Sequence, residues 1–196
     1  AIVWSAPLCM DRMATFKHQE VSSTLQALAK VLLTDEDEAA ALARAKLPDR
    51  PSLPKEVMDL ICSIAHWVAC NSSQLASPPF TSAVSHLVML GVRCDFPVNL
   101  IVEPAVADRL DIFVPAEKVT LLRAFLCAAS GPARSTGRAV ALLAAGLTNS
   151  IQFLQSRDFQ ALSRAFLTSH RAPTDTPSPT AEDLLHWCLV LAADMG

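Results

Sequence analysis

Apolar residues recur at steps of three and four positions along most of this chain, with polar residues between them. The pattern is clearest after Phe113, where one helical face would carry Val119, Leu122, Phe125, Leu126 and Ala129. Pro115 suits the first helical position, and Glu117 would place a negative charge at the positive end of the helix dipole. Such a face is buried only against another helix, so the pattern predicts packed helices.

The same periodicity, read with the turn residues between segments, predicts about nine helices. The expected helices cover residues 16–33, 34–47, 54–71, 77–90, 98–110, 113–130, 138–155, 159–169 and 180–193. Gly91 is expected to end the fourth of them, and Pro104 to interrupt the fifth. Residues 98–102 are the only stretch that also fits a strand, so no strand pair is expected.

Short helices joined by short turns build helical hairpins that stack side by side. We therefore expect an all-α fold, an α-solenoid-like array of about nine helices in stacked hairpins. Residues 1–15 show no clear period and are expected to form an N-terminal docking segment on a helical-repeat domain of residues 16–196.

Three helix openings resemble one another, those at Phe16, Leu53 and Phe113, and a weaker copy begins at Pro177. Phe16 and Leu53 are 37 positions apart, and a period in the thirties is typical of helical-hairpin repeats. Between Leu53 and Phe113 there are 60 positions, with a further proline-led helix at Phe80. A true repeat and helix capping repeated by chance both remain open.

The composition limits the fold classes that the chain can adopt. The 196 residues suffice for one large domain or two small ones, and for a sizeable core. The chain has no tyrosine and only 5 glycines, which argues against a β-sandwich and a glycine-loop enzyme. No charge-free apolar run reaches bilayer length, so we expect no membrane span. Because the chain begins with Ala1, both a removed leader and a fragment remain open.

The six cysteines form no Cys-x-x-Cys pair, and most lie in apolar helical runs: Cys9, Cys62, Cys70, Cys94, Cys127 and Cys188. We expect reduced thiols that serve as small core residues in a reducing compartment. Cys62, His66 and Cys70 are four positions apart on one helix, but its rise separates the outer two by about 12 Å. One metal ion cannot bind both, so a core face is the favoured interpretation, and neither metal nor cofactor is expected.

No catalytic motif is present: there is no nucleophile elbow, glycine-rich phosphate loop or His-Glu-x-x-His. The five histidines have no paired carboxylate at motif spacing. We therefore expect no enzyme, although a catalytic site assembled from several helices remains open as a third hypothesis.

Residues 19–30 and 113–125 resemble repeat units of octatricopeptide and heptatricopeptide-like proteins, and residues 60–67 and 184–187 are similar to their first helix. These helical arrays occur ahead of RAP domains and in FAST-kinase-domain proteins. The resemblance covers about half of the chain, and no RAP-like domain follows. It implies an organellar protein that acts on organelle RNA, as some members do within mitochondrial ribosomes.

A sparse set of basic residues would then face RNA: Lys118, Arg123, Arg134, Arg138, Arg157, Arg164 and Arg171. The net charge of −3 argues against a broad nucleic-acid surface but allows a local patch, and a solvated turn remains the alternative for Arg134 and Arg138.

The functional expectation is a non-catalytic subunit or scaffold of an organellar ribonucleoprotein, a mitochondrial ribosome component that contacts rRNA and neighbouring proteins. Its expected location is the mitochondrial matrix, with another organelle or the cytosol as alternatives. The alternative function is a protein–protein scaffold subunit of a large complex without RNA contact. A basic ridge on the folded surface would favour the first, and an apolar or mixed concave surface the second.

Overall fold

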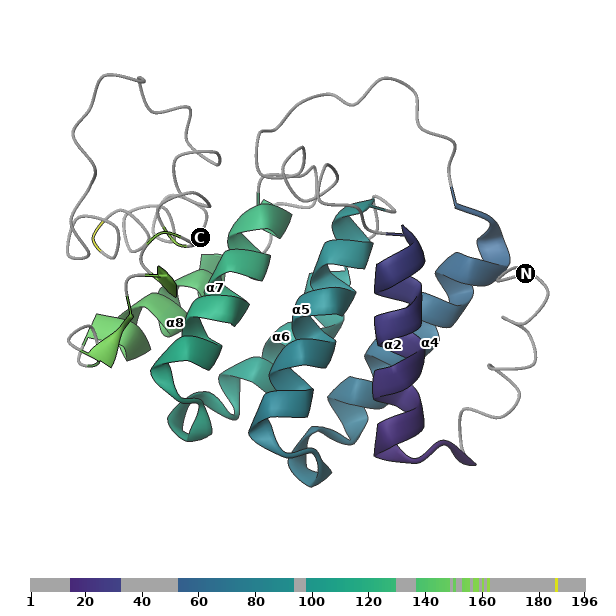
Figure 1. The fold of residues 1–196 in the computed structure, drawn as a ribbon, viewed down its shortest axis with the longest axis horizontal. Helices are drawn as coiled ribbons and strands as arrows, with labels where there is room; N and C mark the ends of the chain where they lie inside the picture. The colour runs from purple at the N-terminus through teal and green to yellow at the C-terminus, as the bar shows by residue number, and fades with distance from the viewer. Residues whose placement is uncertain are drawn as a thin grey trace, which may run out of the picture.

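The computed structural model describes residues 15–32, 53–93, 98–129 and 137–148, with residues 150, 153–155, 157–158, 160, 162 and 186. These parts of the chain form α-helices and short 3-10 helices without any strand (Figure 1). The α-helices are α2 (His18–Leu32), α4 (Lys55–Cys70), α5 (Ser77–Arg93), α6 (Val98–Ala107), α7 (Pro115–Ala129) and α8 (Gly137–Thr148). The 3-10 helices are η2 (Ser72–Gln74) and η3 (Leu110–Ile112). The all-α prediction is confirmed for these residues.

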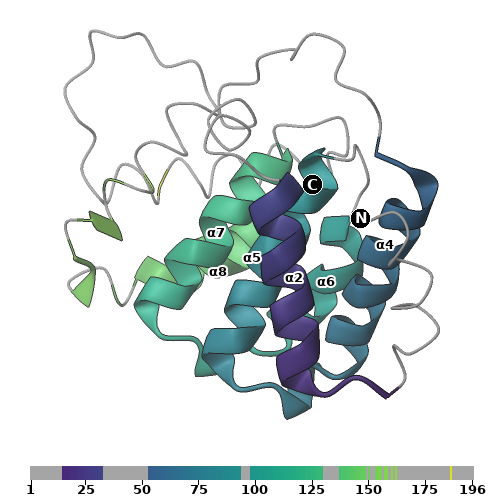
Figure 2. The same cartoon turned by 45° about the vertical axis from the view of Figure 1, so that its right-hand side comes forward.

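The six α-helices lie in two layers. In Figure 1, α2, α5 and α7 stand side by side in front, and α4, α6 and α8 lie behind them; in Figure 2, α4 and α6 are seen to the right of α2. Within the layers α5 packs against α2 and α7, and α6 packs against α4 and α8. Between the layers α5 packs against α4 and α6, and α7 packs against α8. One continuous apolar core fills the space between them.

The buried faces follow the predicted helical spacing. In α4 the buried residues are Val57, Leu60, Ile61, Ile64, Ala65 and Val68. The helix starts directly after Pro54, and at its end the Asn71 side-chain amide donates to the Trp67 carbonyl oxygen (2.9 Å). In α2 the buried positions are Val21, Leu25, Leu28 and Ala29. The steps of three and four residues thus locate the core-facing sides of these helices correctly.

Two predicted helix ends and one predicted interruption are wrong. α5 continues through Gly91 to Arg93 because its last turns are buried, and an interior glycine costs only about 1 kcal/mol. Pro104 lies inside α6 without ending it. Pro104 is exposed, as is Leu100, whose carbonyl oxygen would have accepted the missing N–H, so solvent can satisfy that oxygen. α8 ends at Thr148, short of residue 155, because the Ser150 N–H bonds back to the Leu147 carbonyl oxygen (2.8 Å).

Several predicted elements fall outside the described residues. They include the helix of residues 34–47 and, apart from Thr15, the docking segment of residues 1–15. The helices of residues 159–169 and 180–193 are described only at residues 160, 162 and 186, each of which is helical. Residues 98–102, the one possible strand, belong to α6.

A similar turn follows each helix of the back layer, and the turns after α4 and α6 lie at the lower edge in Figures 1 and 2. After α4, the Gln74 N–H donates to the Asn71 carbonyl oxygen (3.0 Å), and after α6, Ile112 donates to Arg109 (3.1 Å). After α8, Phe153 makes the same bond to Ser150 (3.0 Å). The turns after α4, α6 and α8 therefore share one backbone hydrogen bond between residues three positions apart.

An apolar residue follows each turn and packs into the core: Leu75, Phe113 and Leu154. These residues are 38 and 41 positions apart. Phe16 has the same place before α2, after Thr15 in a 3-10 conformation. The openings at Phe16, Leu53 and Phe113 begin with the same backbone hydrogen bonds, but Leu53 precedes α4, which lies in the other layer, so its place in the fold differs.

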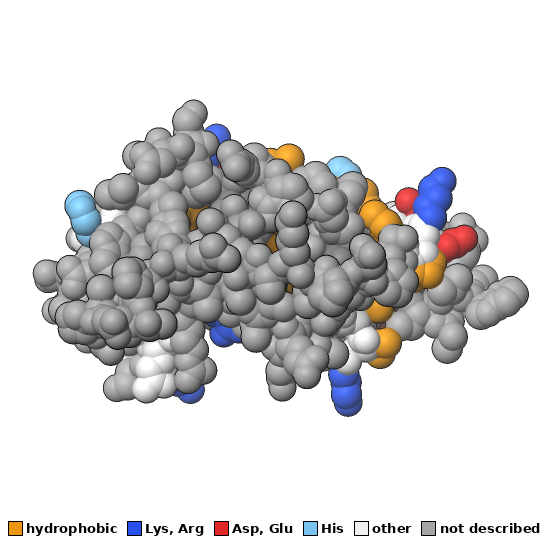
Figure 3. Space-filling view, turned by 90° about the horizontal axis from the view of Figure 1, so that it is seen from above, with side chains coloured by type: hydrophobic (Ala, Val, Ile, Leu, Met, Phe, Trp, Pro, Cys, Tyr) orange, Lys and Arg blue, Asp and Glu red, His pale blue; other side chains and the backbone are white. Residues whose placement is uncertain are grey.

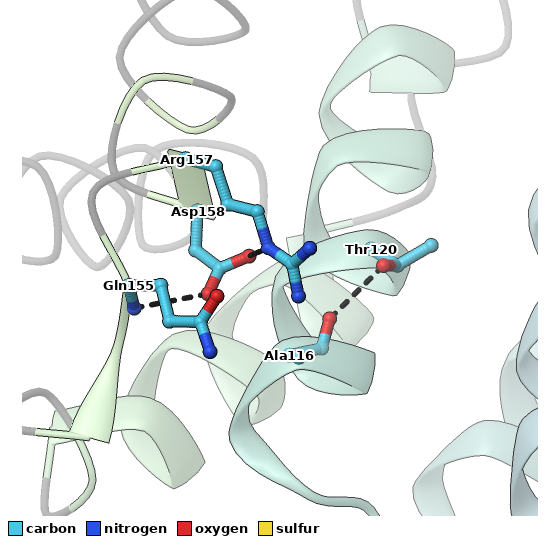
Figure 4. A network of polar contacts seen from close by, with 5 residues as sticks. All are labelled: Ala116, Thr120, Gln155, Arg157 and Asp158. Atoms are coloured by element: carbon cyan, nitrogen blue, oxygen red, sulfur yellow. Dashed lines mark hydrogen bonds and ion pairs between the residues drawn. The ribbon is translucent and has the colours of Figure 1, made fainter.

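An acidic side chain caps the N-terminus of most of the helices that follow these turns. The backbone N–H of Lys17 donates to Glu20 (2.7 Å), that of Val114 to Glu117 (3.0 Å) and that of Gln155 to Asp158 (3.0 Å; Figure 4). Each bond satisfies an N–H that the helix leaves unpaired and places a negative charge at the positive end of the dipole.

Candidate functional site

Arg109 links the 3-10 turn after α6 to the 3-10 turn after α4 by buried polar contacts, which we call the Arg109 joint. It lies at the end of α6, and its guanidinium donates through Nη1 to the Ser72 carbonyl oxygen and through Nη2 to the Leu75 carbonyl oxygen (2.7 Å). The same guanidinium covers the Phe80 ring, with Cζ 4.4 Å from the ring centroid. Phe80 in turn stacks on Phe113, with centroids 5.9 Å apart. One side chain therefore ties the turn after α6 to the turn after α4.

Glu117 completes this joint from the start of α7. It accepts hydrogen bonds from the Ser77 hydroxyl (2.5 Å) and the Val114 N–H (3.0 Å). Burial lowers the pKa of Arg109, and the carboxylate of Glu117 acts in the opposite direction. An arginine remains charged in proteins at any physiological pH, so the joint is permanently ionic. Its groups satisfy one another, which indicates a structural joint rather than a reactive site.

Glu103 is a second buried charge, on α6 at the start of α8. Its Oε1 accepts the backbone N–H of Ala139 (2.9 Å), so a carboxylate from one helix caps the next helix of the same layer. Burial raises the pKa of Glu103 above the ordinary 4.5, while the Ala139 hydrogen bond and nearby Arg138 both act to lower it. The ionised form is therefore less favourable in the folded chain than in the unfolded chain.

This shift predicts an unusual pH dependence for the Glu103→Gln variant. Because the folded pKa is raised, the contribution of Glu103 to stability is greatest below about pH 4.5 and declines as pH rises through the folded pKa. The difference in unfolding free energy, variant minus parent, should move in favour of the variant between pH 4.5 and neutrality. Urea titrations across that range measure it, with exposed Glu56→Gln as the matched control. A difference that does not change with pH would contradict the prediction.

Two of the predicted RNA-facing residues are involved in internal contacts. The Lys118 ammonium donates to the Gly146 carbonyl oxygen near the end of α8 (3.2 Å). Arg138 is exposed at the start of α8, where its charge acts on Glu103. Both therefore support the contacts of α8 within the fold, whether or not they also face a ligand.

The other predicted basic residues are spread along the chain. Arg123 is half-buried on α7 and lowers the pKa of Cys127 by its charge. The side chain of Arg157 is 76% exposed and lies 3.9 Å from the Asp158 carboxylate (Figure 4). Arg134, Arg164 and Arg171 lie outside the described residues. In the view from above, the described lysines and arginines that are visible stand at separate points of the outline (Figure 3). Contact with RNA stays a prediction.

The interpretation of Cys62, His66 and Cys70 as a core face is wrong. His66 and Cys70 are exposed and Cys62 is half-buried, because the stripe through Ile64 lies on the opposite side of α4. Burial and the Asp59 carboxylate both raise the pKa of Cys62, which disfavours its thiolate. Within the described residues, no three histidine, cysteine or acidic side chains come together as metal ligands.

Cys127, by contrast, is a core residue of α7, as predicted. Burial is the main cause that raises the pKa of its thiol to about 12. Iodoacetamide at about pH 8 should therefore leave Cys127 unmodified while it alkylates exposed Cys70, since only the thiolate reacts. Peptide mass mapping measures both, and labelling in concentrated urea is the control. Equal labelling of the two cysteines in the folded chain would contradict the assignment.

Comparison with known proteins gives no relative. No family model matches the chain. No curated protein and no solved structure matches it either. The functional argument therefore rests on the chain's own residues. Among the described helices, none combines the length and the apolar character needed to cross a bilayer.

Arg109 and Glu103 were not predicted from the sequence, because a single charged residue in a helical segment is usually solvated. The exposed apolar side chains at the turns, Ile112, Val114 and Phe153, were not predicted either. Alignment of the segments on the apolar residue that follows each turn would have shown Ile112 and Phe153 at the same position. The alignment on Leu53 hid that relation.

Proposed function

We propose that this chain is a non-catalytic scaffold, an α-solenoid-like array of helical hairpins that holds a partner protein within a larger complex. The observation that supports this best is the turn that recurs after each helix of the back layer, with the apolar residues that follow the turns spaced by 38 and 41 residues. Proteins built from such units offer long surfaces of similar side chains in register, and they use those surfaces for binding.

The polar chemistry of the described residues agrees with this role. The buried charges Arg109 and Glu103 bind backbone groups of adjacent turns and helices, and the acids Glu20, Glu117 and Asp158 close helix starts. These groups hold the units of the array together. All of these groups make contacts within the chain, so their positions are explained by the fold and require no reaction.

The second candidate is the RNA-contacting form of the same scaffold, a subunit of an organellar ribonucleoprotein such as the mitochondrial ribosome. It is supported by the high exposure of Arg157, whose side chain extends from the last described turn. The Asp158 carboxylate beside it weakens the attraction for phosphate, so we rank this candidate second.

Affinity purification of the full chain from its own cells, with and without ribonuclease, tests both candidates. The scaffold proposal expects a stoichiometric protein partner that is retained after ribonuclease. Loss of all partners after ribonuclease would favour the RNA-contacting form, and ribosomal proteins among those lost would support the mitochondrial version. Recovery of the chain alone under both conditions would overturn the scaffold proposal. Fractionation of the same cells tests the mitochondrial matrix as its location.

A further inference from the structure

Exposed apolar side chains are concentrated on the repeated turns. Five large apolar residues of the described part are exposed, and two of them, Val31 and Leu100, lie on helices elsewhere. The other three lie at the last two turns: Ile112 is 54% exposed, Val114 54% and Phe153 68%. Single exposed apolar residues are ordinary, but a group on one edge is not. We call Ile112, Val114 and Phe153 the apolar turn edge.

Ile112 and Phe153 are equivalent in the array. Each closes a 3-10 turn with the same backbone hydrogen bond, and each precedes the apolar residue that enters the core. At the same position the earlier turns have Thr15 and Gln74, which are polar. The position itself therefore does not require an apolar side chain, and the turn folds equally well with a polar one.

The two turns lie at the same end of adjacent helices. η3 packs against α8, and Lys118 in the first turn of α7 reaches the Gly146 carbonyl oxygen near the end of α8. The turn with Phe153 follows directly after α8. Packed helices are about 8–10 Å apart, and from this general spacing we expect a separation of the same order between the two side chains. That distance is close to two turns of an α-helix, about 11 Å.

The exposed charge beside Ile112 is negative, while Arg157, which follows Phe153, is 76% exposed and paired with Asp158 at 3.9 Å. Asp108 precedes η3 and Asp111 lies within it; both are exposed, and neither makes an ion pair with the described residues. The positive charge of Arg109 is buried in the joint, and that of Arg157 faces Asp158. A ligand of this edge therefore meets apolar anchors next to two unpaired carboxylates.

We propose that the apolar turn edge binds an amphipathic helix of a partner protein, with apolar side chains about two turns apart and lysine or arginine beside them. The helix lies across the turns after α6 and α8, so that its anchors cover Ile112 and Phe153 and its cations face Asp108 and Asp111. This inference rests on the proposed scaffold function and names the surface that performs it. Binding of an apolar helix face in such a way is a common mode of recognition.

A model peptide gives the direct test. The probe is a synthetic helix with leucine at positions i, i+3, i+4 and i+7 and lysine between them, and a second peptide has glutamate in place of lysine. We expect the lysine peptide to bind the full chain, and the Ile112→Ser/Phe153→Ser variant to bind it roughly tenfold or more weakly, which corresponds to about 1.4 kcal/mol. The Asp108→Asn/Asp111→Asn variant should weaken binding mainly at low salt.

Val31→Ser is the matched control, because Val31 is 62% exposed at a distance from the turns, and it should leave binding unchanged. The thermal unfolding midpoint of each variant shows whether the fold is kept. The proposal is overturned if the glutamate peptide binds as well as the lysine peptide, if the double serine variant binds normally, or if a single-stranded RNA displaces the peptide from this edge.

The purification experiment separates this inference from the scaffold proposal. If the parent chain recovers a protein partner and the Ile112→Ser/Phe153→Ser variant recovers it equally, the turn edge is wrong and the scaffold proposal stands. Loss of that partner only from the variant supports both. If the parent chain recovers no partner, the scaffold proposal itself fails.

Discussion

Replacement of Phe125 with alanine should lower the free energy of unfolding by about 3–5 kcal/mol, the range seen for large aromatic side chains in protein cores. Phe125 is fully buried on α7, the helix that packs against both α5 and α8. Loss of its ring leaves a cavity that closes only if both contacts relax. Since small domains are stable by about 5–15 kcal/mol, the variant is expected to be partly unfolded near its normal working temperature.

Urea titration followed by far-ultraviolet circular dichroism measures this change. The matched control is Val31→Ala, because Val31 is exposed on α2 and its loss removes little buried surface. A Phe125→Ala variant that unfolds within about 1 kcal/mol of the parent would show that α7 does not connect the two layers as described.

Replacement of Arg109 with alanine should cost about 2–4 kcal/mol, for a different reason. The Leu75 carbonyl oxygen loses its side-chain donor, the Ser72 carbonyl oxygen keeps only the Leu75 N–H (3.2 Å), and Glu117 loses the nearby positive charge. The Phe80 ring also loses the guanidinium above it. These groups remain buried with fewer partners, so the variant bears part of their desolvation cost.

Arg109→Lys distinguishes this explanation from loss of charge alone. A lysine keeps the charge but does not reproduce the planar fork that serves two carbonyl oxygens and a ring at once. It should therefore recover less than half of the lost stability. Arg157→Ala, at an exposed ion pair, is the control and should change stability by less than about 0.5 kcal/mol. If Arg109→Ala behaved like that control, the joint would have no structural role.

Much of the fold can be predicted from the apolar spacing. The starts of α4 and α7 follow from Pro54 and Pro115 with the apolar stripes behind them. The errors arise where packing outweighs local preference. Gly91 is helical because α5 is buried around it, and Pro104 is tolerated because it faces solvent.

The contacts of the candidate site are harder to predict, because they join turns that are far apart in the sequence. Arg109 and Ser72 are 37 positions apart, and nothing near either residue indicates the other. Lys118 was expected to face RNA from its charge alone, although its ammonium is directed at the Gly146 carbonyl oxygen. Cys62 lies on the side of α4 that faces away from the core. The apolar spacing of residues 57–68 is enough to determine that side from the sequence.

The central place of α5 has a consequence for how the chain opens. α5 packs against α2 and α7 in its own layer and against α4 and α6 in the other, so it contacts both layers. Its amide hydrogens can exchange with solvent only when those neighbours also separate. We therefore expect the described helices around α5 to form one cooperative unit that loses its structure together rather than one helix at a time.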